Sequence, residues 1–187
     1  ITGAPDTLRA GDQPTAWASK QQDMGEVWIE VDFPDAVAPE RLRVHEFLRL
    51  FGKLYGIHDP TPQVEAGLER FGITQLGDAM GNELSSGQRT LVGIVKAALH
   101  GPALLILDEP TASLDPDVAL KVRTGLNRLC AEDGAALLVT SHNMVEVERL
   151  CDRVVFISQG KIVADGRPGD VAARFGRDDL EGVFLHL

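Results

Sequence analysis

The strongest constraint on the fold is an alternation of strand-like and helix-like segments in the second half of the chain. Residues 103–107 and 135–140 are short, continuous apolar runs of the kind found in strands that are buried on both faces. Between them, residues 117–131 have a helical pattern. Because a strand, a helix and a second strand in this order form a crossover unit, the alternation predicts an α/β fold with a parallel sheet.

The sequence pattern divides the chain into four segments that we expect to form one domain. We expect a partial sheet region at 1–40, a helical block at 41–100, an α/β core at 101–168 and a helical tail at 169–187. The expected elements outside the alternation are a strand at 27–31, helices at 44–55, 62–71, 87–99 and 143–150, and strands at 154–158 and 161–164.

Composition excludes several classes of function. The chain has 187 residues, 44% hydrophobic and 25% charged, and no stretch approaches the roughly 18 apolar residues of a membrane span. A formal net charge of −10 repels phosphate backbones and anionic lipids, so we expect no nucleic-acid partner. Cys130 and Cys151 have neither metal-ligand spacing nor a disulfide framework, which fits a reducing cytoplasm and buried packing roles.

The heptapeptide LLILDEP at 104–110 places two acidic residues directly after an apolar run. Ligands of open parallel sheets bind beyond the carboxyl ends of the strands, where Asp108 and Glu109 fall. One carboxylate can hold Mg²⁺ and the next can polarise an attacking water. The alternative interpretation is that Asp-Glu-Pro merely ends a strand and begins a turn.

A second candidate site is the pentapeptide LSSGQ at 84–88, which precedes the expected helix at 87–99. Free N–H groups at a helix N-terminus favour phosphate, and small residues such as Ser86 and Gly87 allow it to come close. However, Ser85 and Gln88 also have the spacing of a capping box, which many helices carry for stability alone.

Two further candidates lie near strand ends or helix starts. Ser113, Leu114 and Asp115 follow the acidic pair, and Asp115 before Pro116 is also a good helix cap. His142 follows the apolar run at 135–140 after one intervening residue, although a lone histidine is more often structural than functional. All the candidates could face one anionic ligand.

Taken in order, these four segments resemble the signature motif, the Walker B motif, the D-loop and the switch histidine of the ABC transporter ATPase family. FLRLFGKLYG at 47–56 and LEGVFLHL at 180–187 are similar to segments of bacterial multidrug-type exporters. The resemblance implies a P-loop NTPase-type, RecA-like parallel sheet with an inserted helical subdomain. It also implies a head-to-tail dimer of two ATPase domains that encloses two ATP molecules.

The family resemblance assigns a role to each candidate residue. It implies that Asp108 binds Mg²⁺, that Glu109 is the general base and that His142 contacts the γ-phosphate. The residues that it places against nucleotide across the dimer interface are Ser85, Ser86, Gly87, Gln88 and Asp115. A transmembrane permease is the further partner implied, with the ATPase subunit peripheral on the cytoplasmic face of the membrane. Phe47, Leu50, Phe51 and Tyr55 either help line the groove for that permease or form a packed helix face.

The sequence departs from the family pattern at three points. No lysine is followed by Ser or Thr, so the phosphate-binding G-x-x-x-x-G-K-[ST] loop is absent, and we expect it upstream of Ile1 in a longer protein. A degenerate ATPase that pairs with a competent partner is the alternative. Residues 30–35 lack the usual Q-loop glutamine, leaving Asp32 or Asp35 to contact metal or to be solvated, and Ser86 replaces a glycine.

Two other functional hypotheses remain at the level of sequence. A non-transport ATPase of the same fold, acting on chromosomes, DNA breaks or ribosomes, is disfavoured by the compact helical block and the acidic charge. We also expect that this chain by itself does not bind ATP, because it lacks the phosphate-binding loop.

Overall fold

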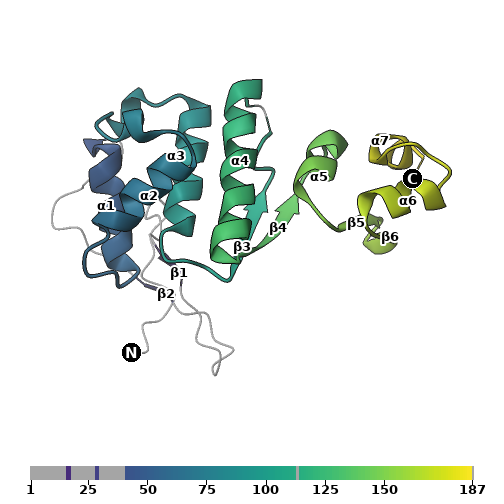
Figure 1. Cartoon of the computed structure of the whole chain (residues 1–187), viewed down its shortest axis with the longest axis horizontal. Coiled ribbons are helices and arrows are strands. Elements are labelled where there is room, and N and C mark those ends of the chain that lie inside the picture. Colours follow the sequence, from purple (N-terminus) through teal and green to yellow (C-terminus); the bar gives the residue numbers. More distant parts are fainter. Residues whose placement is uncertain (1–15, 18–27, 30–40, 113, 187) are drawn as a thin grey trace.

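The computed structural model describes residues 16–17, 28–29, 41–112 and 114–186 (Figure 1). The two short strands β1 (Ala16–Trp17) and β2 (Trp28–Ile29) pair antiparallel. The remainder of the strand predicted at 27–31, the acidic stretch at 30–35 and Ser113 lie outside the described residues. Within the part that the structure describes, no helix is both long and apolar enough to cross a membrane.

The three helices predicted in the first half are confirmed as α1 (Val44–Leu54), α2 (Thr61–Arg70) and α3 (Ser86–Ala98). Two short 3₁₀ turns, Thr74–Leu76 and Gly81–Glu83, lie between α2 and α3. The helices pack against one another because each carries an apolar face at helical spacing. The fully buried members of their shared core are Val44, Leu48, Val64, Leu68, Phe71, Ile73, Leu91 and Val95.

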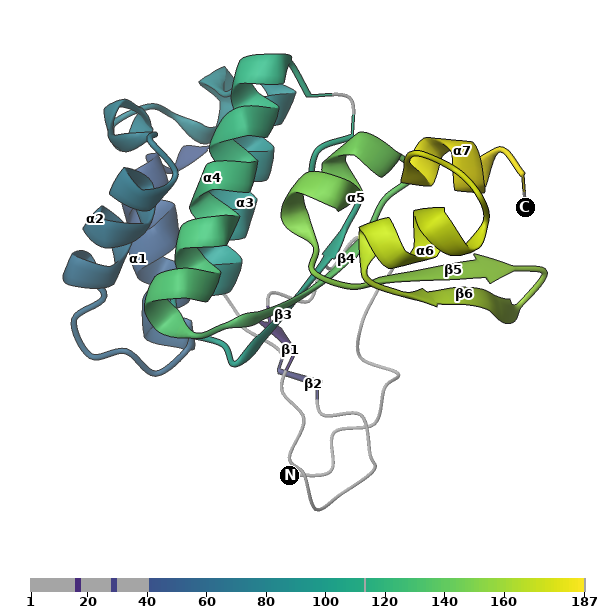
Figure 2. The same ribbon diagram turned by 45° about the vertical axis from the view of Figure 1, so that its right-hand side comes forward.

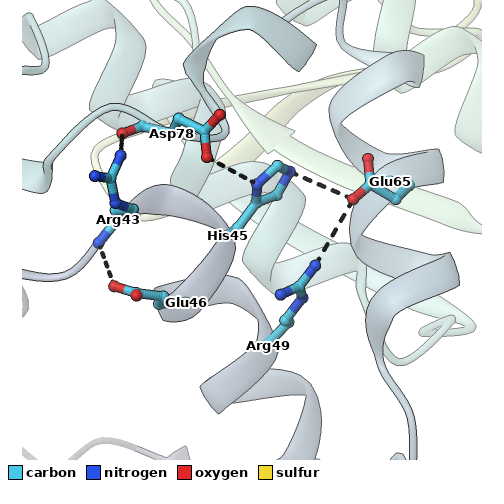
Figure 3. A network of polar contacts seen from close by, with 6 residues as sticks. All are labelled: Arg43, His45, Glu46, Arg49, Glu65 and Asp78. Atoms are coloured by element: carbon cyan, nitrogen blue, oxygen red, sulfur yellow. Dashed lines mark hydrogen bonds and ion pairs between the residues drawn. The ribbon is translucent and has the colours of Figure 1, made fainter.

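A network of polar contacts ties α1 to α2 and to the 77–80 segment (Figure 3). The His45 ring lies between two carboxylates, with Nε2 3.4 Å from Glu65 and Nδ1 3.9 Å from Asp78. The Arg43 guanidinium donates to the carbonyl oxygen of Asp78 at 2.6 Å. A side chain at Gly77 would lie 2.2 Å from the His45 ring, so this position requires glycine for the network to close.

The predicted crossover unit is confirmed as β3 (Leu104–Asp108), α4 (Pro116–Asp133) and β4 (Ala136–Thr140). The strands pair in parallel, from Leu104 opposite Ala136 to Asp108 opposite Thr140. Leu105 and Leu107 join the same hydrophobic core as Val122, Leu126 and Leu129 of α4. The carboxyl ends of both strands therefore lie side by side.

The prediction that these strands are buried on both faces is wrong for the described part of the chain. Leu104, Ile106 and Leu138 are 51%, 65% and 55% exposed, whereas Leu105 is 5% exposed. The first helices and α4 cover one face of the pair, and no described element buries the alternate residues of the other face. The apolar runs predict that both faces of the strand pair are covered, whereas the described residues cover only one face.

The remaining elements form a second unit (Figure 2). They are α5 (Met144–Leu150), β5 (Val154–Ser158), β6 (Lys161–Gly166), α6 (Pro168–Arg174) and α7 (Leu180–Phe184). Their core joins Met144, Val147, Phe156, Leu180 and Val183. β5 and β6 pair antiparallel through a turn at Gln159 and Gly160, so this pair departs from the parallel arrangement predicted for the sheet.

Candidate functional site

The structure brings Asp108 and Thr140 together at the carboxyl ends of β3 and β4. The two residues are register partners in the parallel ladder, and the Thr140 hydroxyl donates to Asp108 Oδ1. The same hydroxyl oxygen accepts a hydrogen bond from the Glu109 N–H, at 3.2 Å. Thr140 therefore fixes the carboxylate of one acidic residue and the backbone of the next.

Glu109 and His142 form the second contact across this strand edge. The Nδ1 atom of His142 lies 2.8 Å from Oε1 of Glu109, and the His142 side chain is 73% exposed. Glu109 has a φ of 48°, in the left-handed region that few residues other than glycine adopt. Its N–H also donates to the carbonyl oxygen of Thr140 at 3.1 Å, which holds this unfavourable conformation in place. The arrangement presents a carboxylate and an imidazole to solvent beside Asp108.

The LSSGQ segment forms the N-terminus of α3, where the capping-box interpretation is confirmed. The Gln88 N–H donates to Ser85 Oγ at 3.2 Å, and the Ser85 N–H donates to Gln88 Oε1 at 2.9 Å. Ser86 occupies the first position of the helix, where its carbonyl oxygen accepts from the Thr90 hydroxyl. A capped helix of this length still presents first-turn N–H groups and its positive dipole end to solvent.

The start of α4 contains Asp115 and packs against Gly87 of α3. Asp115 occupies the N-cap position of α4, but its side chain accepts no capping hydrogen bond from the first turn among the described residues. Gly87 is buried, and a Cβ atom there would lie 3.1 Å from Val118 and 3.5 Å from Leu114. The small residue lets the N-terminus of α3 pack closely on the first turn of α4.

The predicted site residues therefore fall into two groups in the described chain. Asp108, Glu109 and His142 share one strand edge, and residues 85–88 share one packing contact with the segment around Asp115. No hydrogen bond or ion pair between described residues joins the first group to the second. The described residues also hold no cluster of three or more His, Cys, Asp or Glu side chains that could hold a metal ion by itself.

Sequence similarity decides the family. A model of the family described as "ABC transporter" matches residues 12–112, which is more than half of the chain. The chain belongs to the ABC transporter family. Asp108 and Glu109, at the end of β3, lie inside the region that matches the family model, and His142 lies beyond it.

Individual relatives of this ABC protein agree with that assignment. The linearmycin resistance ATP-binding protein LnrL of Bacillus subtilis is 36% identical over 141 residues, covering 74% of this chain and 45% of the relative. The phosphonates import ATP-binding protein PhnC 1 of Ruegeria sp. is 35% identical over 117 residues, covering 63% and 44%. The chain thus spans about half the length of the curated relatives it matches.

A solved structure supports the P-loop NTPase fold of the ABC family for this chain. The structure of an ATP-binding subunit of an ABC transporter superposes with a TM-score of 0.66 at 29% identity, covering 80% of this chain and 64% of that one. The predicted fold class is confirmed by this likeness and by the parallel β3 and β4 pair.

Sequence reasoning missed Thr140 as a member of this candidate site. Its role depends on the register that places it opposite Asp108, and register is a property of strand pairing rather than of either strand alone. The signal available in the sequence was that two strands of a crossover unit end in polar residues. Asp108 and Thr140 are each the last residue of their strand, so aligning the ends of the two strands would have placed them opposite each other.

Proposed function

We propose that the full-length protein containing this chain is the ATP-hydrolysing subunit of an ABC transporter. The observation that carries the proposal is the strand edge where Asp108 and Thr140 face each other and Glu109 contacts His142. Phosphoryl transfer to water needs positioned charge more than covalent catalysis, and this edge supplies a metal-binding carboxylate, a base and a hydrogen-bond donor.

The donor chemistry of the edge fits Mg²⁺ and ATP. Mg²⁺ usually takes one or two protein carboxylates and fills its remaining positions with water and phosphate oxygens, so Asp108 alone is a sufficient protein ligand. Bound Mg²⁺ would neutralise charge on the phosphates. Thr140 holds the Asp108 carboxylate in one orientation, which reduces the entropy lost on binding.

Glu109 and His142 have complementary roles in the proposed reaction. The Glu109 carboxylate accepts a proton from the attacking water. His142, when both ring nitrogens are protonated, donates from Nδ1 to Glu109 and from Nε2 to a γ-phosphate oxygen. The 2.8 Å contact between Glu109 and His142 therefore sets the position of the base relative to the histidine that donates a hydrogen bond to the phosphate.

The α3 N-terminus supplies the second half of a composite site. In the proposed head-to-tail dimer, the Ser85 hydroxyl and the N–H groups of Ser86 and Gly87 contact the γ-phosphate held by the partner domain. Gln88 stabilises this helix start through the capping box, and Asp115, whose carboxylate is not used as a cap, faces the opposite nucleotide site.

The test of the ATPase proposal is Glu109→Gln in the full-length protein. We expect kcat for ATP hydrolysis to fall by roughly 10²–10⁴-fold, the usual contribution of a general base, with ATP still bound. Glu181→Gln, on an exposed first-turn position of α7, is the matched control and should leave kcat unchanged. Unchanged hydrolysis in Glu109→Gln would remove Glu109 from the role of base.

This chain by itself is proposed not to bind ATP. The 187 residues contain no G-x-x-x-x-G-K-[ST] sequence, and the lysine and N–H groups of that loop hold the β- and γ-phosphates. Titration of the isolated chain with Mg-ATP should give no heat of binding. Binding in the micromolar range would contradict the proposal and favour a site built from the present residues.

A membrane permease is the proposed second partner, with the subunit peripheral on the cytoplasmic face. A cavity of about 340 Å³ beside α1 and α3 supports this docking. It is lined by Leu42, Val44, Phe47, Gly81, Leu84, Arg89, Val92, Gly93 and Lys96. Phe47 thus lines a surface that a permease loop could enter, whereas Phe51 is only 8% exposed and belongs to the core.

The proposed direction of transport is export. Similarity to a relative named for linearmycin resistance supports export, whereas similarity to relatives named for phosphonate import favours the opposite direction. A strain lacking the gene should become more sensitive to hydrophobic antibiotics and should grow normally with a phosphonate as phosphorus source. The reverse pattern would identify an importer.

A further inference from the structure

An ion pair links the two helices that flank the candidate site. Arg123 lies on α4, eight positions after Asp115, and Glu146 lies in the first turn of α5, four positions after His142. Arg123 Nη1 is 2.8 Å from Glu146 Oε1 and 3.0 Å from Glu146 Oε2. The contact therefore joins the helix that begins at Asp115 to the helix that begins just after His142.

Both partners of this pair are shielded from solvent. The Arg123 side chain is 16% exposed and the Glu146 side chain 14%, whereas each of the other ion pairs between described residues has at least one partner that is 34% exposed or more. A shielded pair is weakly screened by salt and leaves an uncompensated charge when one partner is removed. The Arg123–Glu146 contact is therefore a strong positional constraint.

Glu146 is also tied to the backbone beside His142. Its N–H donates to Oδ1 of Asn143, the N-cap residue of α5, at 3.2 Å. Asn143 follows His142 directly, and its own N–H donates to Ser141 Oγ at 3.1 Å. A displacement of Glu146 would consequently be transmitted to the 141–143 segment through these two hydrogen bonds.

The pair also bridges the two hydrophobic cores. The residue at the centre of α4, Leu126, belongs to the first core, whereas Met144 and Val147 of α5 belong to the second. The chain passes from one core to the other through the segment that contains His142. The side chain of His142 is 73% exposed, so packing does not hold it in place.

We propose that Arg123 and Glu146 are positioning residues that set the distance between His142 and Glu109. The inference rests on the proposed ATPase function, because the geometry matters for hydrolysis only if these two residues act on ATP. The ion pair holds α5 against α4, and the Asn143 cap passes that position to His142. Neither Arg123 nor Glu146 contacts the nucleotide in this scheme.

The first test compares kinetic constants of the full-length protein carrying Arg123→Met, Glu146→Gln or Arg123→Lys. Loss of the pair should lower kcat roughly tenfold or more with the KM for ATP unchanged, because small displacements of reacting groups are costly in rate. Arg123→Lys keeps the charge and should recover most of kcat. Arg70→Met is the matched control, since Arg70 pairs with Asp133 at 2.7 Å at the C-terminal end of α4.

The second test uses the 187-residue chain and needs no activity. In Arg123→Met and Glu146→Gln, the imidazole NMR signals of His142, assigned with His142→Gln, should shift more than those of His45 or His100. Arg70→Met should instead shift His100, which lines the same cavity as Arg70.

The outcomes separate the two proposals. If Arg123→Met lowers kcat no more than Arg70→Met, or if the His142 signals do not move, the positioning role is wrong. If the unmodified full-length protein fails to hydrolyse ATP, the proposed function is wrong and the NMR comparison alone decides whether the pair positions His142.

Discussion

Gly125→Ala on α4 provides a direct test of how the helical block is packed. A Cβ atom at this position would lie 2.2 Å from Cδ1 and 2.4 Å from Cε1 of Phe71, far inside the roughly 3.5–4.0 Å of favourable carbon contacts. Phe71 is 1% exposed, so its ring cannot move without displacing other core residues. The methyl group therefore overpacks the contact between the α2 end and α4.

The net effect is a balance of two terms. Overpacking costs about 1–3 kcal/mol, and replacing glycine by alanine inside a helix returns about 0.5–1 kcal/mol. We expect the free energy of unfolding to fall by about 0–2.5 kcal/mol, which lowers Tm by up to about 10 °C in a chain of this length. Thermal and urea unfolding followed by circular dichroism at 222 nm measure both quantities.

Gly93→Ala is the matched control, because a Cβ atom on this α3 residue meets no atom of the described residues within 4 Å. It should raise the free energy of unfolding by about 0.5–1 kcal/mol through helix propensity alone. The reasoning is refuted if Gly125→Ala is as stable as Gly93→Ala. Adding Phe71→Leu should reduce the cost of Gly125→Ala, since the two side chains compete for one volume.

Two further predictions concern the surface and the cysteines of the chain. Burial, followed by the charge of Asp152, raises the pKa of both Cys130 and Cys151, so less thiolate is present at pH 8 than in free cysteine. Both should react with iodoacetamide more slowly than glutathione does at pH 8 and faster once urea unfolds the chain; equal rates before unfolding would count against this environment. Ile106→Glu, at a 65% exposed position, should reduce dye binding by the exposed sheet face and change stability by less than about 0.5 kcal/mol. Leu105→Glu, at a 5% exposed position, should unfold the chain, and similar effects of the two substitutions would mean that the faces were misassigned.

The helices could be predicted closely from sequence because their signals are local. α1 repeats apolar residues at helical spacing and ends before Gly56, whose φ of 85° suits a residue without a side chain. α4 begins at Pro116 and ends before Gly134, whose φ is 69°. Such start and stop residues act within one or two turns, so no tertiary information is needed.

The site was predictable only as far as its motifs. Asp108, Glu109 and His142 stand at strand ends that the sequence locates, and the structure brings them together. The part played by Thr140 depends on register, and the Arg123 to Glu146 contact depends on where the fold places α5 relative to α4. Both are long-range pairings, which no local pattern encodes.

Burial of the sheet was the other feature that sequence could not decide. An apolar run indicates that a strand is suited to pack against other apolar residues. It does not show whether other described residues pack on each of its faces. Ile106 is apolar and 65% exposed, while Leu107, its neighbour, is buried. The apolar run predicted burial of both faces of the strand, and the packing of the helices determines which face is buried.

The left-handed backbone of Glu109 implies a conflict between folding and chemistry at one residue. A φ of 48° costs a side chain with a Cβ atom about 1–2 kcal/mol relative to glycine, and asparagine is also tolerated better there. Selection for stability alone would replace this glutamate. If Glu109 is the proposed general base, the chain accepts a small loss of stability to keep a carboxylate at this strand end, and mutational scans for thermostability should select inactive proteins at this position.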